Sequence, residues 1–179
     1  MLRHLPLLAA ATAALIGAPG AAHADVIAAT TNSFHIRHEV PLVVPAARAF
    51  DLLARPGDWW SDAHSYSGAA ANMRLELRPG GCFCEIWDAG AVEHLRVVAV
   101  TPGEQVVLAG GLGPLLYAPA SGTMVWKVEP GGTGAILTID YKVTGFAAND
   151  AAEWSSRVDA VLAEQVMRFR AAAAAMPRR

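Results

Sequence analysis

The 179-residue sequence has only two cysteines, Cys82 and Cys84, so no second cysteine pair accompanies them. It also lacks an excess of positive charge: the formal net charge is −2, which gives no reason to expect nucleic acid or an anionic membrane as a partner. The glycine-rich segment GGLGPL lacks the lysine of a phosphate-binding loop, and no serine has the spacing of a nucleophile elbow. No internal repeat is present. These absences exclude the commonest nucleotide-binding and serine-nucleophile signatures.

A hydrophobic run long enough to span a bilayer is also missing. The apolar stretch from Leu5 to Ile16 has 12 residues, fewer than the ~20 that a membrane-spanning helix requires. Arg3 precedes it, and the small-x-small sequence 22–24 (AHA) follows it. This pattern predicts a signal peptide over residues 1–24, cleaved after Ala24, and hence a periplasmic or secreted protein without stable membrane insertion. Loss of Arg3 leaves 13 of the 14 basic residues against 16 acidic ones, a net charge of −3.

Residues 25–179 fit one domain, with a core over about 34–170. The segment 34–44 alternates and is rich in β-branched residues, which predicts a first strand after a polar lead-in, and Pro41 predicts an edge or a bend. The segment 45–54 has helical spacing with proline at its start. A second short helix or an ordered loop is expected to follow, through Tyr66.

Six segments with a period of two then follow, separated by turns rich in glycine and proline: MRLELR, CFCEIW, VEHLRVVAV, QVVLAG, GTMVWKVE and AILTIDYKV. They predict an antiparallel meander. Residues 149–175 place apolar side chains at helical spacing and would form a helix of roughly 40 Å. The expected architecture is an α+β domain whose curved sheet wraps around this last helix.

Several motifs, in this order, resemble a known superfamily: WWSDAHSYSG, GGCFCE, the isolated His94 in VEHLRVV, GGLGPL, GTMVWKVEP and VDAVLAEQ. They look like an exported bacterial branch of the SRPBCC superfamily, which includes START lipid-transfer domains, the birch-pollen-allergen fold, polyketide cyclases and homologues of heat-shock-protein ATPase activators. The resemblance implies a helix-grip fold whose cavity, between the sheet and the C-terminal helix, takes hydrophobic small molecules without a cofactor. It does not imply a particular reaction, because members of one fold differ in function.

The resemblance and the pattern together give a set of candidate residues. The family motif falls on Trp59, Trp60, His64, Tyr66, Ser67, Gly68, Asn72, Cys82, Phe83, Cys84, Glu85, His94 and Gln165. The candidate ligand-binding residues are Trp59, Trp60, His64, Tyr66, Phe83, Glu85, Trp87, Leu112, Leu115, Trp126, Leu162 and Gln165. The glycine-rich segment GGLGPLLYAP is expected to cap the mouth of the cavity as a flexible loop.

The two cysteines allow three interpretations. Side chains at i and i+2 of a strand share a face, with Cα atoms roughly 6.5–7 Å apart, so a disulfide requires the strand to bend. If Trp87 pairs with Ala91, Cys84 lies opposite His94, and the two thiols with that imidazole could hold zinc or copper, with His64 as a fourth ligand. The cysteines are otherwise small buried hydrophobic residues.

The same strand raises the question of which face lines the cavity. If the face of Phe83, Glu85 and Trp87 points inward, burial is expected to raise the pKa of Glu85 and to make it a candidate acid or base. Otherwise Glu85 is a solvated residue or the partner of an arginine. His64 and Tyr66 lie in a polar loop at the expected mouth of the cavity, where they could transfer protons or simply hold the loop together.

Three functions remain open from the sequence. The preferred one is an exported module that binds a hydrophobic or amphipathic small molecule. The second is a cyclase, hydratase or hydrolase that uses His64, Tyr66, Glu85 and His94 as acid and base. The third is a metal or thiol-redox protein built on Cys82, Cys84 and His94. The oligomeric state is left open.

Overall fold

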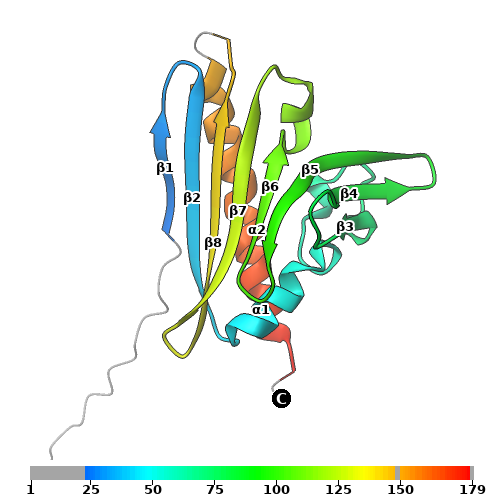
Figure 1. The fold of residues 1–179 in the computed structure, drawn as a ribbon, viewed down its shortest axis with the longest axis vertical. Helices are drawn as coiled ribbons and strands as arrows, with labels where there is room; N and C mark the ends of the chain where they lie inside the picture. The colour runs from blue at the N-terminus through cyan, green and yellow to red at the C-terminus, as the bar shows by residue number, and fades with distance from the viewer. Residues whose placement is uncertain (1–22, 148–149, 178–179) are drawn as a thin grey trace, which may run out of the picture.

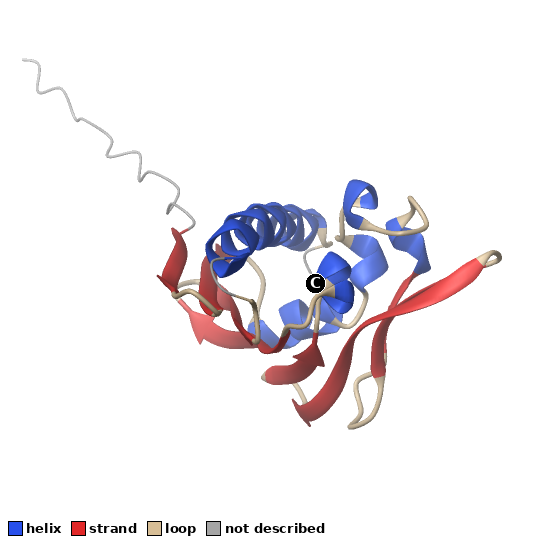
Figure 2. Ribbon diagram, turned by 90° about the horizontal axis from the view of Figure 1, so that it is seen from above, coloured by secondary structure: helices blue, strands red, loops and turns tan. Residues whose placement is uncertain are grey.

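A curved antiparallel sheet with a long helix against its concave face forms the protein (Figures 1 and 2). The computed structural model describes residues 23–147 and 150–177. The predicted signal peptide lies outside these ranges, except that His23 and Ala24 begin the first strand. The strands are β1 (His23–Ala29), β2 (Ser33–Leu42), β3 (Met73–Leu75), β4 (Cys82–Trp87), β5 (Gly90–Thr101), β6 (Gln105–Gly110), β7 (Ser121–Gly131) and β8 (Gly134–Thr144). The α-helices are α1 (Ala46–Leu53) and α2 (Asp150–Ala175), and the 3₁₀ helices are η1 (Pro56–Asp58), η2 (Asp62–His64), η3 (Ala70–Asn72) and η4 (Gly113–Tyr117).

The sheet has the order β1-β2-β8-β7-β6-β5-β4-β3. Strands β3 to β8 form the predicted meander, and β2 joins it by pairing with β8. The predicted segment MRLELR is a strand only over its first three residues, while the other five predicted segments form strands close to their expected lengths. The α+β helix-grip fold expected from the sequence is therefore confirmed.

An eighth strand, β1, was not expected, because its sequence was interpreted as part of a lead-in. It pairs antiparallel with β2, from the pair His23–Glu39 to the pair Ala29–Phe34. Pro41 lies beyond the pair His23–Glu39, where the pairing with β1 has ended. Among the described residues, one side of β2 therefore carries no strand at Pro41, and the missing proline N–H costs no hydrogen bond there. Pro41 therefore lies in an interior strand, at the end of that strand with which β1 does not pair.

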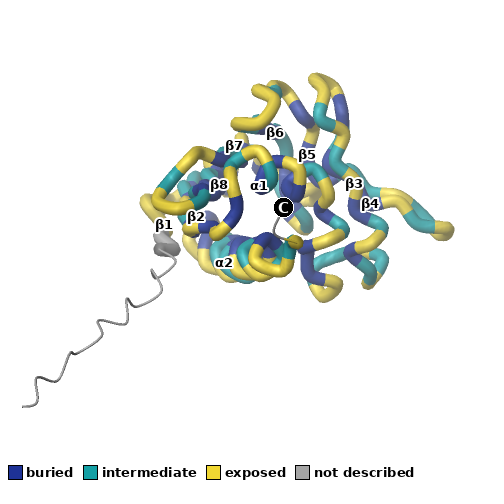
Figure 3. The backbone as a smooth tube through the Cα atoms, turned by 90° about the horizontal axis from the view of Figure 1, so that it is seen from below, coloured by how far each residue is buried: buried dark blue, intermediate teal, exposed yellow. Residues whose placement is uncertain are grey.

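The long helix α2 packs most extensively on β2, with further contacts to β1, β8 and α1. Its buried side chains include Val158, Leu162, Val166 and Phe169, which recur every three or four residues. Burial alternates along the strands facing it, as the tube colours of Figure 3 show. No helix in the described part of the chain is long and apolar enough to cross a membrane.

Helix α1 contacts β7 and β8, and the segment that follows it contacts β3 through η1 and β4 through η3. Helix α1 buries Phe50 and Leu53, and the chain then passes through three 3₁₀ turns. This arrangement brings Trp59 and Trp60 under the sheet, where both are nearly fully buried. The space between this segment, β5 and α2 is where the candidate site lies.

Candidate ligand pocket

Four segments far apart in the sequence enclose a pocket of about 380 Å³. They are residues 60–66, His94 of β5, residues 112–114 and one face of α2. Most of the lining is apolar or aromatic, which is typical of sites for small organic molecules. The lining side chains and backbone come from Trp60, Ala63, His64, Ser65, Tyr66, His94, Leu112, Gly113, Pro114, Trp154, Arg157, Val158 and Val161.

The candidate residues from the sequence divide into two groups. Trp60, His64, Tyr66, His94 and Leu112 line the pocket. The two adjacent tryptophans have different roles, since Trp60 is pocket wall and Trp59 is core, packed against Trp126 and Phe169. The candidates that do not line the pocket are Trp59, Phe83, Glu85, Leu115, Trp126, Leu162 and Gln165, which are buried, and Trp87, which is half-buried beside Gly90 at the end of a hairpin.

The contribution of α2 to the pocket was missed as a site feature. Trp154, Val158 and Val161 belong to the apolar stripe that predicts this helix, and Arg157 lies beside them. The stripe shows which face of the helix is inside, but it does not show which of its turns contact core and which face a vacant space. That distinction depends on where the sheet curves away from the helix. The apolar repeat of the helix gives no information about the curvature of the sheet.

Most polar residues of the WWSDAHSYSG motif hold the pocket loop in place. The Asp62 side chain accepts a hydrogen bond from the backbone N–H of Ala70, at 2.6 Å. Asn72 donates to the Ser67 hydroxyl at 2.9 Å. Gly68 has φ of 74°, a conformation that residues with a Cβ rarely adopt. The motif therefore builds a rigid loop around the pocket, and few of its polar groups are left to meet a ligand.

Glu85 is the buried acceptor at the centre of this loop. Its side chain is fully buried, and its two oxygens accept hydrogen bonds from the backbone N–H groups of Tyr66, at 2.8 Å, and of Ser67. Burial by itself would raise its pKa, but the hydrogen bonds from Ser67, Tyr66 and His94 outweigh burial and hold the pKa below its ordinary value. The expected raised pKa of Glu85 is therefore wrong, because the loop supplies backbone donors that the sequence did not reveal.

His94 faces inward because the β4–β5 hairpin pairs Trp87 with Gly90 rather than with Ala91, and a β-bulge follows at His94. The hairpin pairs Trp87 with Gly90 and Cys84 with Glu93, whereas the next pair joins Phe83 to Leu95. His94 is the extra residue between these pairs. The expected opposition of Cys84 and His94 is wrong, and Cys82 pairs with Arg96. The bulge leaves two successive residues of β5, His94 and Leu95, buried on the same side of the sheet.

The imidazole of His94 is 3% exposed and lies between two rings, with centroid distances of 5.4 Å to Phe83 and 5.7 Å to Tyr66. Its Nε2 is 3.4 Å from Oε2 of Glu85. Within the described residues, its Nδ1 has no hydrogen-bond partner. Burial lowers the pKa of His94, and the Glu85 carboxylate counteracts this only in part. The ring is therefore neutral at pH 7 and presents one unpaired nitrogen.

The remaining titratable groups of the pocket lie toward its rim. His64 Nε2 is 3.0 Å from Oε2 of Glu164 on α2. The pKa of Glu164 is lowered, first by a hydrogen bond from Ser61 and then by His64 and Arg168. Tyr66 is exposed, and its pKa is raised by partial burial and by the proximity of Tyr117 and Glu85. Of the four candidate acid–base residues, three line the pocket, and Glu85 lies directly behind His94.

The roof of the pocket is the segment around η4. Tyr141, fully buried in β8, accepts a hydrogen bond from the backbone N–H of Leu112 at 3.1 Å and donates to the carbonyl of Gly110 at 3.0 Å. Gly111 approaches the backbone of Leu115 so closely that a Cβ would lie 2.7 Å from its carbonyl oxygen. This segment was expected to be a flexible cap, and the structure shows it as a short helix fixed at its start by a buried tyrosine.

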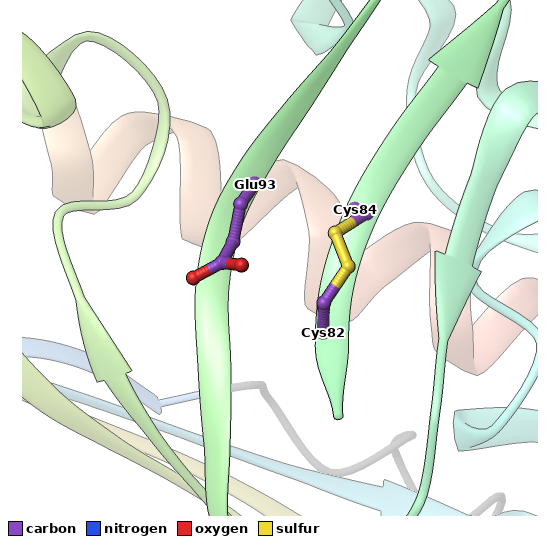
Figure 4. Close-up of side chains that lie close together, drawn as sticks. All are labelled: Cys82, Cys84 and Glu93. Carbon is purple, nitrogen blue, oxygen red and sulfur yellow. A yellow bond between two sulfur atoms is a disulfide. The ribbon is translucent and has the colours of Figure 1, made fainter. Parts of the chain in front are cut away.

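The two cysteines form a disulfide (Figure 4). They alternate with Glu85 along β4 and therefore lie on the opposite face of that strand. Their Cα atoms are 5.4 Å apart, closer than in a regular strand, because the ladder is irregular at this point. Among the described residues, the group whose atoms could share a metal ion is Cys82, Cys84 and Glu93. The set of two cysteines with His94 that the sequence suggested is not assembled, because His94 is on the pocket side.

No protein-family profile and no curated protein matches the sequence. Solved structures do share its fold. DynU16, from the dynemicin biosynthetic locus, has a TM-score of 0.53 at 16% identity over 76% of this chain, which spans only 45% of DynU16. MLL2253 from Mesorhizobium loti has a TM-score of 0.55 at 14% identity, over 80% of this chain and 99% of its own. Ms6760 from Mycobacterium smegmatis has 0.55 at 17%, over 89% and 99% respectively. At these identities the likeness concerns the fold alone.

Proposed function

We propose that the protein is an exported SRPBCC-type domain that binds a hydrophobic or amphipathic small molecule in the pocket between residues 60–66, β5, the η4 segment and α2. The observation that carries the proposal is the pocket itself. It has about 380 Å³ of space and a mostly apolar wall, with a buried histidine nitrogen left unpaired beside it. A pocket of this kind, with few polar groups on an apolar wall, is the usual form of a small-molecule site.

The loop anchoring supports the same function. Glu85, Gln165 and Tyr141 are all fully buried, and each hydrogen-bonds to the backbone of a segment that lines the pocket. Rigid walls reduce the conformational entropy that binding would otherwise cost. The signal-peptide pattern of residues 1–24 supports export, so the ligand would be met outside the cytoplasm.

Native mass spectrometry of protein purified from the periplasm, followed by denaturing mass spectrometry, tests the proposal. We expect an organic adduct that is lost on denaturation. The variant Val161→Trp, which fills the pocket from α2, should abolish the adduct. Val98→Trp makes the same change at an exposed site on β5 and should leave the adduct intact. An adduct insensitive to Val161→Trp, or the absence of binding of any apolar compound, contradicts the proposal.

A second candidate function is acid–base catalysis on the bound molecule. The specific observation in its favour is the Glu85–His94 pair, in which a carboxylate orients an imidazole at the pocket wall. The two functions differ in whether the ligand leaves unchanged. Recovering the native adduct, supplying it again in excess and measuring its mass and stereochemistry after incubation separates a carrier from an enzyme.

A further inference from the structure

His94 differs from the other polar groups around the pocket. The remaining polar side chains of the lining already engage the protein itself. These contacts are Trp60 Nε1–H to the carbonyl of His64, Ser65 Oγ–H to the carbonyl of Asp62, His64 with Glu164, and Arg157 with Glu153. The exposed Tyr66 hydroxyl can be satisfied by water. Nδ1 of His94 is the buried polar atom that is left over.

The hydrogen on His94 can be assigned from Glu85. Both Glu85 oxygens accept backbone N–H donors, and such hydrogen bonds stabilise the carboxylate relative to the carboxylic acid. Glu85 is therefore an ionised, acceptor-only group. The imidazole nitrogen that faces it, Nε2, must carry the hydrogen, because the other tautomer would direct a lone pair at a negative charge.

This assignment fixes the chemistry of the other nitrogen. With the hydrogen on Nε2 and the ring neutral, Nδ1 presents a lone pair and no proton. Nε2 faces Glu85, which lies behind the pocket wall, and His94 belongs to the lining, so Nδ1 is the ring nitrogen that remains without a partner at the wall of the pocket. Buried acceptors in native proteins are almost always paired, and here no protein donor is within reach in the described residues.

We propose that the pocket selects a molecule with an apolar body and a neutral hydrogen-bond donor, a hydroxyl or an N–H group, and that His94 Nδ1 accepts that hydrogen bond. The inference rests on the proposed function and specifies the chemical class of its ligand. It also excludes carboxylates and other anions as preferred ligands at this position, because the acceptor nitrogen has no proton to offer and the Glu85 charge lies behind it.

Three naphthalene probes test this selectivity by calorimetry at pH 7.5: 2-naphthol, its methyl ether 2-methoxynaphthalene, and 2-naphthoate. They share the apolar body and differ in the polar group. We expect 2-naphthol to bind about tenfold more tightly than the methyl ether, the difference that one hydrogen bond gives. We expect 2-naphthoate to bind most weakly. Equal affinity for the naphthol and its ether, or preference for the carboxylate, overturns the inference without any variant being made.

Two histidine variants locate the acceptor. His94→Gln places an amide nitrogen near the position of Nε2 and keeps the contact with Glu85, but it offers nothing at Nδ1. His94→Asn places an amide oxygen near Nδ1 and gives up the contact with Glu85. The preference for naphthol over its ether should fall to about one in His94→Gln and persist in His94→Asn. Persistence in His94→Gln overturns the inference.

The outcome for the proposed function is separate. If none of the three probes binds, or if Val161→Trp leaves their binding unchanged, the pocket is not the binding site and the proposed function fails together with the inference. If all three bind equally and Val161→Trp blocks them, the proposed function stands and the inference fails. His35→Gln, a histidine outside this pocket, serves as the matched control and should reproduce the wild-type preference.

Discussion

Gln165 on α2 accepts a hydrogen bond from the backbone N–H of Ser61, with Oε1 2.9 Å from the nitrogen. Both residues are buried, so this contact joins the last helix to the loop that lines the pocket, and neither group has access to water. Gln165, a polar residue on the apolar face of α2, therefore has a structural role, because its hydrogen bond connects the helix to the pocket loop.

Replacing Gln165 by leucine should destabilise the protein. The Ser61 N–H would remain buried without an acceptor, which costs about 1–3 kcal/mol. Urea unfolding followed by tryptophan fluorescence measures the loss. Met167→Leu, on the exposed side of the same helix, is the control and should change the free energy of unfolding by less than about 0.5 kcal/mol. If the two variants lose the same free energy of unfolding, the hydrogen bond between Gln165 and Ser61 contributes nothing to stability.

Glu85→Gln should be more damaging. The amide can accept one of the two backbone N–H groups, but its NH₂ group would face the other donor, so we expect a loss of about 2–4 kcal/mol. The loop 61–72 should then exchange its amide hydrogens faster. Glu93→Gln, at a half-exposed carboxylate on the neighbouring strand, should cost less than about 1 kcal/mol. Slow exchange of the loop in Glu85→Gln would contradict the anchoring role.

Stability should fall in acid because the pKa values of Glu85 and His94 are both lowered in the folded protein. The unfolded chain then binds more protons than the folded one. The contribution of His94 is complete above its unfolded pKa of 6.5, and that of Glu85 is complete above 4.5. Each is lost as the pH falls through the respective folded pKa. Unfolding at pH 7.5, 6 and 4.5 measures this, and His94→Gln should flatten the change between pH 7.5 and 6.

Tyr141→Phe should loosen the roof of the pocket. Leu112 N–H and the Gly110 carbonyl would both lose their partner, for an expected loss of about 1–3 kcal/mol. Burial raises the pKa of Tyr141 to about 12, so its contribution to stability is full below pH 10 and is lost as the pH rises toward 12. Unfolding between pH 8 and 11 should show a decline that is smaller in the phenylalanine variant. If stability declines equally in the wild-type protein and in the phenylalanine variant, the alkaline sensitivity does not come from Tyr141.

The disulfide should contribute little to stability. It closes a loop of only three residues, for which the chain-entropy relation gives about 1.6 kcal/mol. Reduction of the wild-type protein with dithiothreitol should lower the unfolding midpoint slightly and leave the affinity for 2-naphthol unchanged, because the sulfurs lie on the other face of the sheet from His94. The double variant Cys82→Ala, Cys84→Ala should behave in the same way. A change in naphthol affinity on reduction would contradict this separation.

The sequence predicted the fold well because the information is local. Alternation in β7, with Met124, Trp126 and Val128 all inward, and the apolar repeat of α2 each require only a few neighbouring residues. Strand β1 was missed because its pairing with β2, not its own composition, makes it a strand. The helical stripe likewise predicted α2 without showing which of its turns would face a pocket.

The site was less predictable because it depends on the register of one hairpin and on backbone groups. The expected pairing of Trp87 with Ala91 placed His94 beside Cys84, whereas the observed pairing of Trp87 with Gly90 puts His94 on the other face. The donors to Glu85 are backbone N–H groups of Tyr66 and Ser67, and any residue type other than proline could supply them. The direction of the Glu85 pKa shift therefore could not be derived from the side chains alone.

The register of the β4–β5 hairpin also places two kinds of chemistry on opposite faces of these strands. The sulfur atoms face the outside of the sheet beside Glu93 and Arg96, while the imidazole and its carboxylate face the inside. A thiol in the surrounding medium therefore approaches the Cys82–Cys84 disulfide from the side of the sheet away from the pocket. Substitutions on the disulfide face of β4 and β5 are therefore independent of substitutions on their pocket face.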